Sequence, residues 1–286
     1  MKLIILLFAS LFLSCSTQRV AVTPARTITK GVEVVTMDYT VTDSKGNNLP
    51  TKIFLFDVRL SERVSIVATT VGDSDSSICS TEEQMTLKAP LSEQLEAMQA
   101  KRQNIKVLGG VNADFFHIRT SQMPCGVVYR NGVCIKGGYD SLTTVFALLT
   151  DGTARCMSSS EYEALDKTLI AEAVSGRQML LNDGVAQSSS TRLEPRTAVG
   201  VTRDGRRVFI LVADGRRKEY SNGLSYADMA VIFKRLGAYD AINLDGGGSS
   251  SFSVEVATGD FAPINRPSDR SGERPVPNGI AIVEMK

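Results

Sequence analysis

The chain has 286 residues, of which 43% are hydrophobic, and its 32 Lys and Arg residues nearly balance its 31 Asp and Glu residues. This composition is typical of a globular protein with one large domain or two small ones. A net charge of +1 provides no overall attraction for nucleic acid or an anionic membrane, so any anion-binding site must be local.

The N-terminus has the pattern of an export signal. The apolar run from Leu3 to Leu13 follows a lysine and is too short to span a bilayer, which takes about 20 residues. Its ending, Leu13-Ser14-Cys15, resembles a bacterial lipobox, which implies cleavage before Cys15 and acylation of that residue. We therefore predict a signal peptide over residues 1–14, a polar tether over residues 15–30, and a membrane-anchored lipoprotein in the periplasm or on the outer-membrane or cell surface. The alternative is a plain signal peptide in which Cys15 is incidental.

Turn signals dominate the chain after the tether. Asn131-Gly132, Asp151-Gly152 and Asp204-Gly205 each stand between strand-like apolar runs, which is a strong hairpin signal. Three such hairpins predict a largely antiparallel sheet system. Further strands are expected near residues 31–41, 51–59, 64–70, 106–112, 177–182, 239–244, 250–256 and 279–285.

Helices are expected to be fewer. Ser225 and Asp228 form a capping-box pattern, and the apolar residues after them recur at helical spacing. Two more helices are expected over residues 91–104 and 161–174. Because no internal repeat or long linker is apparent, we predict one α+β domain over residues 31–286, with mixed, largely antiparallel sheets and a few packed helices.

One stretch, Asn243 to Phe252, places three glycines and three serines directly after Asp245. Glycines in series suggest positive φ angles or a group packed against bare backbone, and phosphate is a candidate for that group. After them, Phe252, Val254 and Val256 alternate with polar residues and predict a half-buried strand. Dinucleotide and Walker loops need a helix at this point, so those two phosphate-binding classes are disfavoured. A tight turn with a glycine bulge is the alternative interpretation.

Apolar strands end in a carboxylate three times, at Asp114, Asp214 and Asp245. A two-residue turn at Asp204-Gly205 pairs Arg196 with Ala213, which brings Arg196 and Asp214 to the same end of the hairpin. An arginine held there suits a bidentate contact with phosphate, and a structural ion pair with Asp214 is the alternative. Asp114 has its own alternative role, the capping of a turn.

The cysteines and the histidine exclude some chemistry. In an exported protein Cys79, Cys125, Cys134 and Cys156 can oxidise, and their pairing is open. The chain has one histidine, His117, and neither a CxxC nor a GxSxG motif. A Cys/His zinc site and a serine hydrolase triad are therefore disfavoured.

Several motifs together resemble the phosphodiester glycosidase family. They are VNADFF, EPRTAVGVTRDGRRVFILVADGR, NLDGGGSS and RPSDRSGERPVPNGIAIV, and they lie in the family's order over roughly residues 100–286. The resemblance implies an α+β fold and hydrolysis of a sugar-1-phosphodiester, such as an N-acetylglucosamine-1-phospho-glycan. Cleavage at the glycosidic C–O bond would release the sugar and leave a phosphomonoester.

The resemblance also implies a set of site residues. Asn112 and Asp114 match the family's Asn-Gly-Asp-Phe-Phe element, with Ala113 where glycine is usual. The other matched positions are Arg196, Asp214, Arg216, Asn243, Asp245, Gly246, Gly247, Gly248, Ser249, Ser250, Glu273 and Arg274. We expect catalysis from Asp245 and Asp114, with Glu273 next. The glycine amides, the two serines and Arg196 or Arg274 are expected to bind the phosphate, and Asp214 to orient an arginine.

Two other functions stay open at this stage. One is a phosphodiesterase that breaks the P–O bond of the same substrates. The other is a non-catalytic glycan-binding lipoprotein, which the absence of tryptophan disfavours because sugars often stack on large aromatic rings. The asparagine and aspartate oxygens also suit Ca²⁺ or Mg²⁺, so a metal cofactor is a possibility that the sequence leaves undecided.

Overall fold

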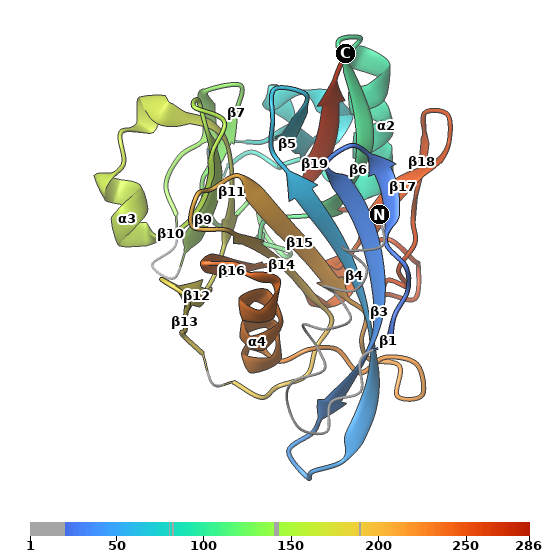
Figure 1. The fold of residues 1–286 in the computed structure, drawn as a ribbon. Coiled ribbons are helices and arrows are strands. Elements are labelled where there is room, and N and C mark those ends of the chain that lie inside the picture. Colours follow the sequence, from blue (N-terminus) through green and yellow to red (C-terminus); the bar gives the residue numbers. More distant parts are fainter. Residues whose placement is uncertain (1–20, 80, 82, 140–142, 189) are drawn as a thin grey trace.

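The computed structural model describes residues 21–79, 81, 83–139, 143–188 and 190–286 (Figure 1). The expected signal peptide, the lipidation site Cys15 and the first part of the tether lie outside the described residues. No helix within the described residues has the length and apolar character needed to cross a membrane.

Three antiparallel sheets make up the fold. The largest runs in the order β1 (Ala21–Val22), β3 (Val32–Thr42), β4 (Asn48–Arg59), β15 (Arg207–Ala213), β14 (Arg196–Val201), β16 (Asp240–Leu244), β12 (Met179–Asn182) and β13 (Val185–Ala186), with β2 (Arg26–Thr29) on β3. The second runs in the order β10 (Ala154–Ser158), β9 (Thr144–Leu149), β11 (Ile170–Gly176), β7 (Val128–Arg130) and β8 (Val133–Lys136). The third runs in the order β18 (Asp260–Pro263), β17 (Phe252–Ala257), β6 (Ile105–Asn112), β19 (Asn278–Met285) and β5 (Val64–Thr70).

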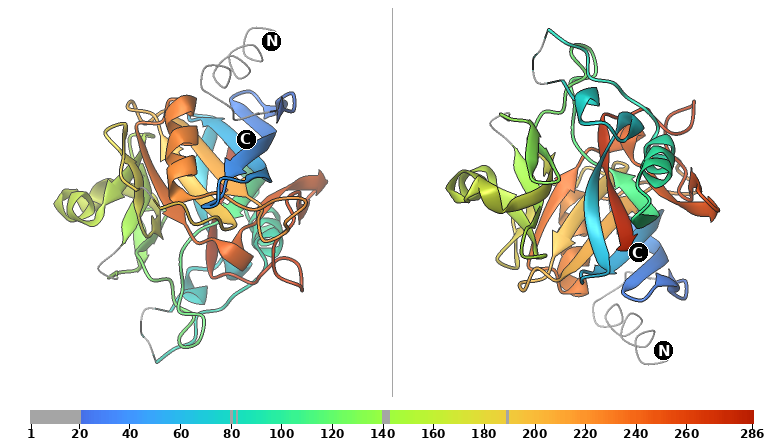
Figure 2. Two further views of the ribbon diagram at one scale, coloured as in Figure 1. Left: turned by 90° about the horizontal axis from the view of Figure 1, so that it is seen from below. Right: turned by 90° about the horizontal axis from the view of Figure 1, so that it is seen from above.

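Three α-helices in the described part of the chain complete the fold: α2 (Leu91–Lys101), α3 (Ser159–Ala164) and α4 (Tyr226–Leu236). Helix α4 covers one face of the largest sheet, α2 packs beside the third sheet, and α3 lies at the edge of the second sheet (Figures 1 and 2). The predicted antiparallel character is therefore confirmed, but sheets dominate the fold more than the α+β prediction implied.

Local sequence signals identified several elements correctly. The three Asn-Gly or Asp-Gly hairpins are present as β7–β8, β9–β10 and β14–β15. Helix α4 begins with the predicted capping box, in which the Ser225 hydroxyl accepts from the Asp228 N–H at 3.0 Å and the Asp228 carboxylate accepts from the Ser225 N–H at 3.1 Å. These elements were predictable because their signals lie within a few residues of one another.

The helix predicted over residues 161–174 is wrong. Helix α3 ends at Ala164, a short 3₁₀ turn spans Lys167–Leu169, and β11 occupies Ile170–Gly176. Strand β11 is central in the second sheet, and Glu172 within it accepts N–H bonds from Ala68 and Asn131 of other elements. Tertiary pairing therefore overrides a short apolar pattern that periodicity alone cannot assign.

The four cysteines outside the signal region are not joined to one another. Cys79 and Cys125 are half-buried, Cys134 is exposed and Cys156 is buried, and none of them forms a disulfide with another of the four. The disulfides that the sequence allowed among these four cysteines are therefore not formed in the described structure.

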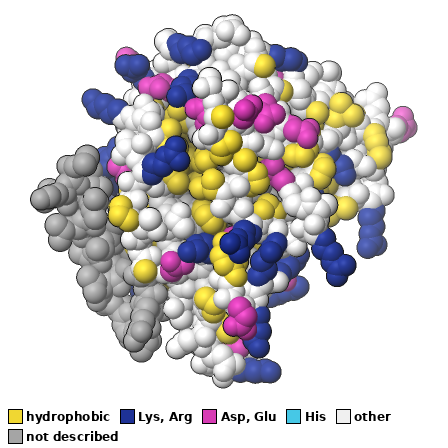
Figure 3. All heavy atoms as spheres, turned by 90° about the vertical axis from the view of Figure 1, so that its right-hand side faces the viewer, with side chains coloured by type: hydrophobic (Ala, Val, Ile, Leu, Met, Phe, Trp, Pro, Cys, Tyr) yellow, Lys and Arg dark blue, Asp and Glu magenta, His cyan; other side chains and the backbone are white. Residues whose placement is uncertain are grey.

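Phe252 joins the third sheet to the largest one. Its ring stacks on Phe56 with 4.0 Å between the ring centroids and lies 5.9 Å from Phe54. It is fully buried, whereas Val256 in the same strand is 59% exposed. Figure 3 shows the right-hand side of the view in Figure 1, where hydrophobic side chains gather between charged ones. Because Phe252 closely follows the glycine–serine stretch, this stacking anchors that stretch to the core.

We expect Phe252→Ala to lower the free energy of unfolding by about 3–5 kcal/mol, because it removes a stacked ring and leaves a cavity between two sheets. Denaturant unfolding would measure this loss. Val256→Ala in the same strand is the matched control and should change the free energy by less than about 0.5 kcal/mol. Equal losses in the two variants would contradict the role assigned to Phe252.

Candidate active site

The side chain of Asn112, the last residue of β6, is a centre of hydrogen bonds. Its Nδ2 donates to the Asp245 carbonyl at 2.7 Å, and its Oδ1 accepts from the Thr197 hydroxyl at 2.8 Å and from the Ser251 N–H at 3.1 Å. These partners come from β14 and from the segment between β16 and β17. One buried amide thus brings three segments of the sequence motifs together.

Asp114 lies just beyond Asn112 and is 2% exposed. Its two carboxylate oxygens accept from the Ser175 N–H at 2.8 and 3.0 Å, and one of them accepts from Asn278 Nδ2 at 3.2 Å. Burial raises the pKa of Asp114 to about 7, although these donors and the Lys136 charge favour the ionised form. The negative charge of Asp245 adds to the rise.

Asp245 is half-buried and is tied to the Asp114 segment, because its N–H donates to the Ala113 carbonyl at 2.8 Å. Burial raises the pKa of Asp245 to about 6, while the Ser249 hydroxyl and the charges of Arg274 and Arg177 favour its ionised form. The charge of Asp245 thus acts on Asp114, and the pKa values of both carboxyl groups lie near neutrality. Two carboxyl groups whose surroundings give them different, perturbed pKa values are typical of a site for acid–base catalysis.

Groups of the protein pack directly against the glycines after Asp245. A Cβ on Gly246 would lie 2.7 Å from the Pro195 carbonyl oxygen, and one on Gly248 would collide with the side chains of Asp269 and Arg274. Gly247 has a φ of +63°, and its missing Cβ would lie 3.1 Å from the Arg216 guanidinium. Glycine is therefore needed at these three positions, because other protein groups, including two guanidiniums, lie where a Cβ atom would be.

The Glu273–Arg274 pair lies on the other side of this stretch. Arg274 makes a bidentate contact with Asp269 at 2.7 and 3.0 Å and donates to the Ser249 hydroxyl at 3.3 Å. Glu273 accepts from three hydroxyls, those of Ser92 at 2.6 Å, Ser251 at 2.5 Å and Ser253 at 3.3 Å. The carboxylate of Glu273 thus links helix α2 to β17.

Arg196 does not point toward Asn112. The predicted register with Ala213 is confirmed, but the Arg196 guanidinium stacks 4.3 Å from the Tyr226 ring centroid and donates to the Leu224 carbonyl at 3.1 Å. The ion pair with Asp214 is not among those of the described residues. Successive side chains of a strand face opposite sides, so the neighbouring Thr197 faces Asn112 instead.

Asp214 orients a loop backbone and not an arginine side chain. Its carboxylate accepts from Asn265 Nδ2 at 2.9 Å, from the Arg266 N–H at 2.9 Å and from the Tyr220 hydroxyl at 2.9 Å, and burial raises its pKa. The loop that it holds continues to Glu273 and Arg274. Arg216 is exposed and forms an ion pair with Glu194 at 2.9 Å.

Two more of the predicted site residues, Asn243 and Ser250, differ in their hydrogen bonding. Asn243 accepts from the Gln178 N–H at its Oδ1 at 2.8 Å and from the Arg177 N–H at its carbonyl at 3.3 Å. The Ser250 hydroxyl is buried without a hydrogen-bond partner in the described structure.

The sequence analysis missed Ser175, Arg177, Lys136 and Asn278 near the two carboxylates. Ser175 is the penultimate residue of β11 and Arg177 directly follows the strand, so this segment enters the site through the pairing of β11, which the sequence analysis did not predict. A correct prediction of β11 as a strand that ends in Ser-Gly and is followed by an arginine would have been the available signal.

The oxygens suggested from the sequence for Ca²⁺ or Mg²⁺ are engaged with protein groups. The amide oxygens of Asn112 and Asn243 both accept hydrogen bonds from protein groups. Within the described ranges, no group of three or more His, Cys, Asp or Glu side chains is arranged to hold a metal ion. We therefore derive no chemical step that uses a metal.

The family model for phosphodiester glycosidases matches residues 106–283, more than half of the chain, and the chain therefore belongs to this family. The family comprises hydrolases. The match begins close to the start of β6 and includes every site residue described above except Ser92.

Particular relatives are N-acetylglucosamine-1-phosphodiester α-N-acetylglucosaminidases. Those of Mus musculus and Bos taurus are each 29% identical over 161 residues, which is 49% of this chain and 30% of theirs, so the chain matches less than a third of their length. The zebrafish catalytic domain, described as auto-inhibited by its pro-peptide, is 18% identical with a TM-score of 0.65, over 94% of this chain and 87% of that chain. A putative exported protein from Burkholderia pseudomallei is 12% identical with a TM-score of 0.59, over 95% and 98%. The two structural matches show a shared fold.

We expect Asp114→Asn to raise the free energy of unfolding at pH 8 by about 1–3 kcal/mol, because it removes a buried negative charge but keeps an acceptor for Ser175. Because the folded protein raises the pKa of Asp114 to about 7, the protonated form of Asp114 favours folding. This contribution to stability is full below about pH 4 and is lost as the pH rises through 7. The gain should therefore shrink at pH 5. Exposed Asp260→Asn is the control in denaturant unfolding, and a gain in Asp114→Asn that is the same at both pH values would refute the explanation.

Proposed function

We propose that this chain hydrolyses sugar-1-phosphodiesters at the glycosidic C–O bond, releasing the sugar and leaving a phosphomonoester. Family membership supports the reaction class, and the names of the mouse and cattle relatives specify N-acetylglucosamine-1-phosphodiesters as their substrates. An N-acetylglucosamine-1-phospho-glycan is accordingly the first substrate to test.

The observation that carries this proposal is the coupled pair Asp114 and Asp245. Glycoside hydrolysis generally requires two carboxyl groups, one ionised and one protonated. Burial places the pKa of Asp245 near 6 and that of Asp114 near 7, so between these values the favoured state has Asp245 ionised and Asp114 protonated.

The two groups have complementary roles in the proposed reaction. The negative charge of Asp245 stabilises the positive charge that develops at the anomeric carbon as its bond to the phosphate oxygen breaks. The bonding electrons pass to the phosphate oxygen, which Asp114 can protonate. A water oxygen forms the new bond to carbon and keeps one of its protons as the sugar hydroxyl. The other water proton passes to solvent and so restores the protonated form of Asp114. A phosphomonoester is already a stable leaving anion, so the reaction depends less on the proton of Asp114 than on the charge of Asp245.

The other carboxylate and amide candidates from the sequence act as positioning residues in this proposal. Glu273 is held by three hydroxyls, and Asp214 holds the loop that leads to Arg274. Asn112 fixes the backbone of Asp245. Because burial brings the pKa values of Asp114 and Asp245 to about 7 and about 6, we assign proton transfer to these two residues.

We also propose that the mature chain is tethered to a bacterial membrane through acylated Cys15, with the domain facing the periplasm or the cell exterior. Strands β1 and β2, within the residues predicted as tether, pair with β3 and so belong to this domain. The lipobox-like ending of the apolar N-terminal run supports this location. Substrates attached to exported glycans would then be accessible.

Hydrolysis in ¹⁸O-water containing EDTA tests the bond that breaks. We expect the label in the released sugar, because water attacks carbon, and Asp245→Asn should lower the rate about 10³-fold. Mass spectrometry of both products measures the label. Label in the phosphate would indicate a phosphodiesterase, binding without turnover would indicate a glycan-binding protein, and turnover only without EDTA would indicate an essential metal.

The dependence of kcat/KM on pH should be bell-shaped with a maximum between about 6 and 7. Activity falls at lower pH because Asp245 becomes protonated, and at higher pH because Asp114 loses its proton. Asp114→Asn should lose about 10²-fold in rate and also lose the alkaline limb. An unchanged alkaline limb in that variant would assign the limb to another group.

A further inference from the structure

The arginines selected from the sequence motifs are already engaged with protein groups. Arg196 stacks on Tyr226 and donates to backbone carbonyls, Arg216 pairs with Glu194, and Arg274 pairs with Asp269. A substrate phosphate needs a cation that is close to the carboxylate pair and whose N–H groups are not already used.

Arg177 occupies such a position because its backbone is held against the site. A Cβ on the preceding Gly176 would collide with the Asn243 carbonyl, so β11 passes directly over β16 at this point. The Arg177 N–H donates to the Asn243 carbonyl at 3.3 Å, and the next N–H, of Gln178, donates to Asn243 Oδ1 at 2.8 Å. Both groups of Asn243 thus fix the segment from which the Arg177 side chain projects.

The Arg177 side chain itself is exposed and lies over an aromatic ring. Its guanidinium lies 5.4 Å from the centroid of the Phe115 ring, and its charge favours the ionised form of Asp245. Unlike Arg216 and Arg274, it has no ion pair with a described residue. Stacking uses the face of a guanidinium and leaves its N–H edge available for a planar, bidentate contact.

We propose that the N–H edge of Arg177, stacked on Phe115 and held in place by Asn243, binds the phosphate group of the substrate. This assignment rests on the proposed function and specifies its substrate class, because the same sugar without a phosphate would make no contact with Arg177. The guanidinium also compensates the repulsion between the phosphate and Asp245 and stabilises the charge that the departing phosphate oxygen acquires.

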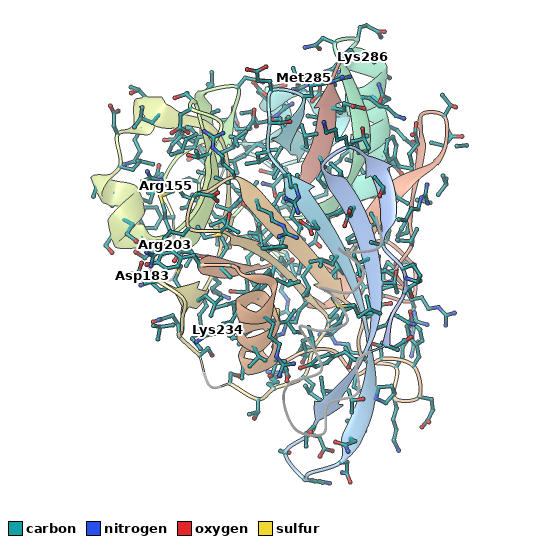
Figure 4. All side chains as sticks on the ribbon, in the orientation of Figure 1. Arg155, Asp183, Arg203, Lys234, Met285 and Lys286 are labelled. Carbon is teal, nitrogen blue, oxygen red and sulfur yellow. The ribbon has the colours of Figure 1, made fainter. Side chains whose placement is uncertain are left out.

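Two variants of exposed, ring-stacked arginines test the proposal. Arg177→Gln removes the guanidinium near the carboxylates, and Arg203→Gln is the matched control. Arg203 stacks 4.2 Å from the Tyr239 ring centroid and lines a pocket of about 590 Å³ at the opposite ends of β14 and β16 (Figure 4). Both side chains are exposed, so neither change is expected to impair folding.

We expect Arg177→Gln to lower kcat/KM for an N-acetylglucosamine-1-phosphodiester about 10–100-fold, with Arg177→Lys intermediate and Arg203→Gln unchanged. Turnover of a nitrophenyl glycoside of the same sugar should change less than about threefold in all variants. Equal losses on both substrates, or no loss in Arg177→Gln, would overturn the proposal.

Binding of inorganic phosphate, measured by calorimetric titration, provides a readout that does not depend on catalysis. We expect Arg177→Gln to weaken this binding at least about tenfold relative to the unmodified protein and to Arg203→Gln. Failure of the unmodified protein to cleave any sugar-1-phosphodiester would refute the proposed function alone. Phosphate binding that is absent, or equal in all variants, would refute the assignment of Arg177.

Discussion

The whole site depends on the hydrogen bonds of one buried amide, that of Asn112. Its donor group fixes the carbonyl of Asp245, and its oxygen fixes Thr197 of the largest sheet and Ser251 at the start of β17. The amide provides a donor and an acceptor on separate atoms, and losing it would leave several buried partners unsatisfied. The meeting of two sheets at this residue is what brings the carboxylates together.

In this arrangement, what the chemistry needs lowers the stability of the fold. Burial disfavours the ionised forms of both Asp114 and Asp245, and the negative charge of Asp245 adds to the effect at Asp114. N–H donors from Ser175 and Asn278 offset part of that cost without neutralising the pair. Sites of this kind retain an energetic cost because the same burial that weakens the fold sets the pKa values near neutrality.

Predictions from the sequence succeeded where the determining signals were local. The Asp204-Gly205 turn determined the pairing of Arg196 with Ala213, and the capping residues determined where α4 begins. They failed at β11, because its strand conformation depends on pairing with β9 and β7, which are distant in sequence. That failure also hid Arg177, which is therefore a consequence of topology and not of a recognisable motif.

By itself, the sequence determined the family, the antiparallel hairpins and the positions of Asp114 and Asp245 after apolar strands, because each of these depends on residue types at short, fixed spacing. Only the tertiary structure decided which side chains meet. It directs Arg196 toward Tyr226, directs Arg177 toward Phe115, and packs Arg216, Arg274 and Pro195 against the three glycines. The physical reason is that local spacing specifies which face of a strand a side chain occupies, whereas the group opposite that face is set by the packing of sheets from distant parts of the chain.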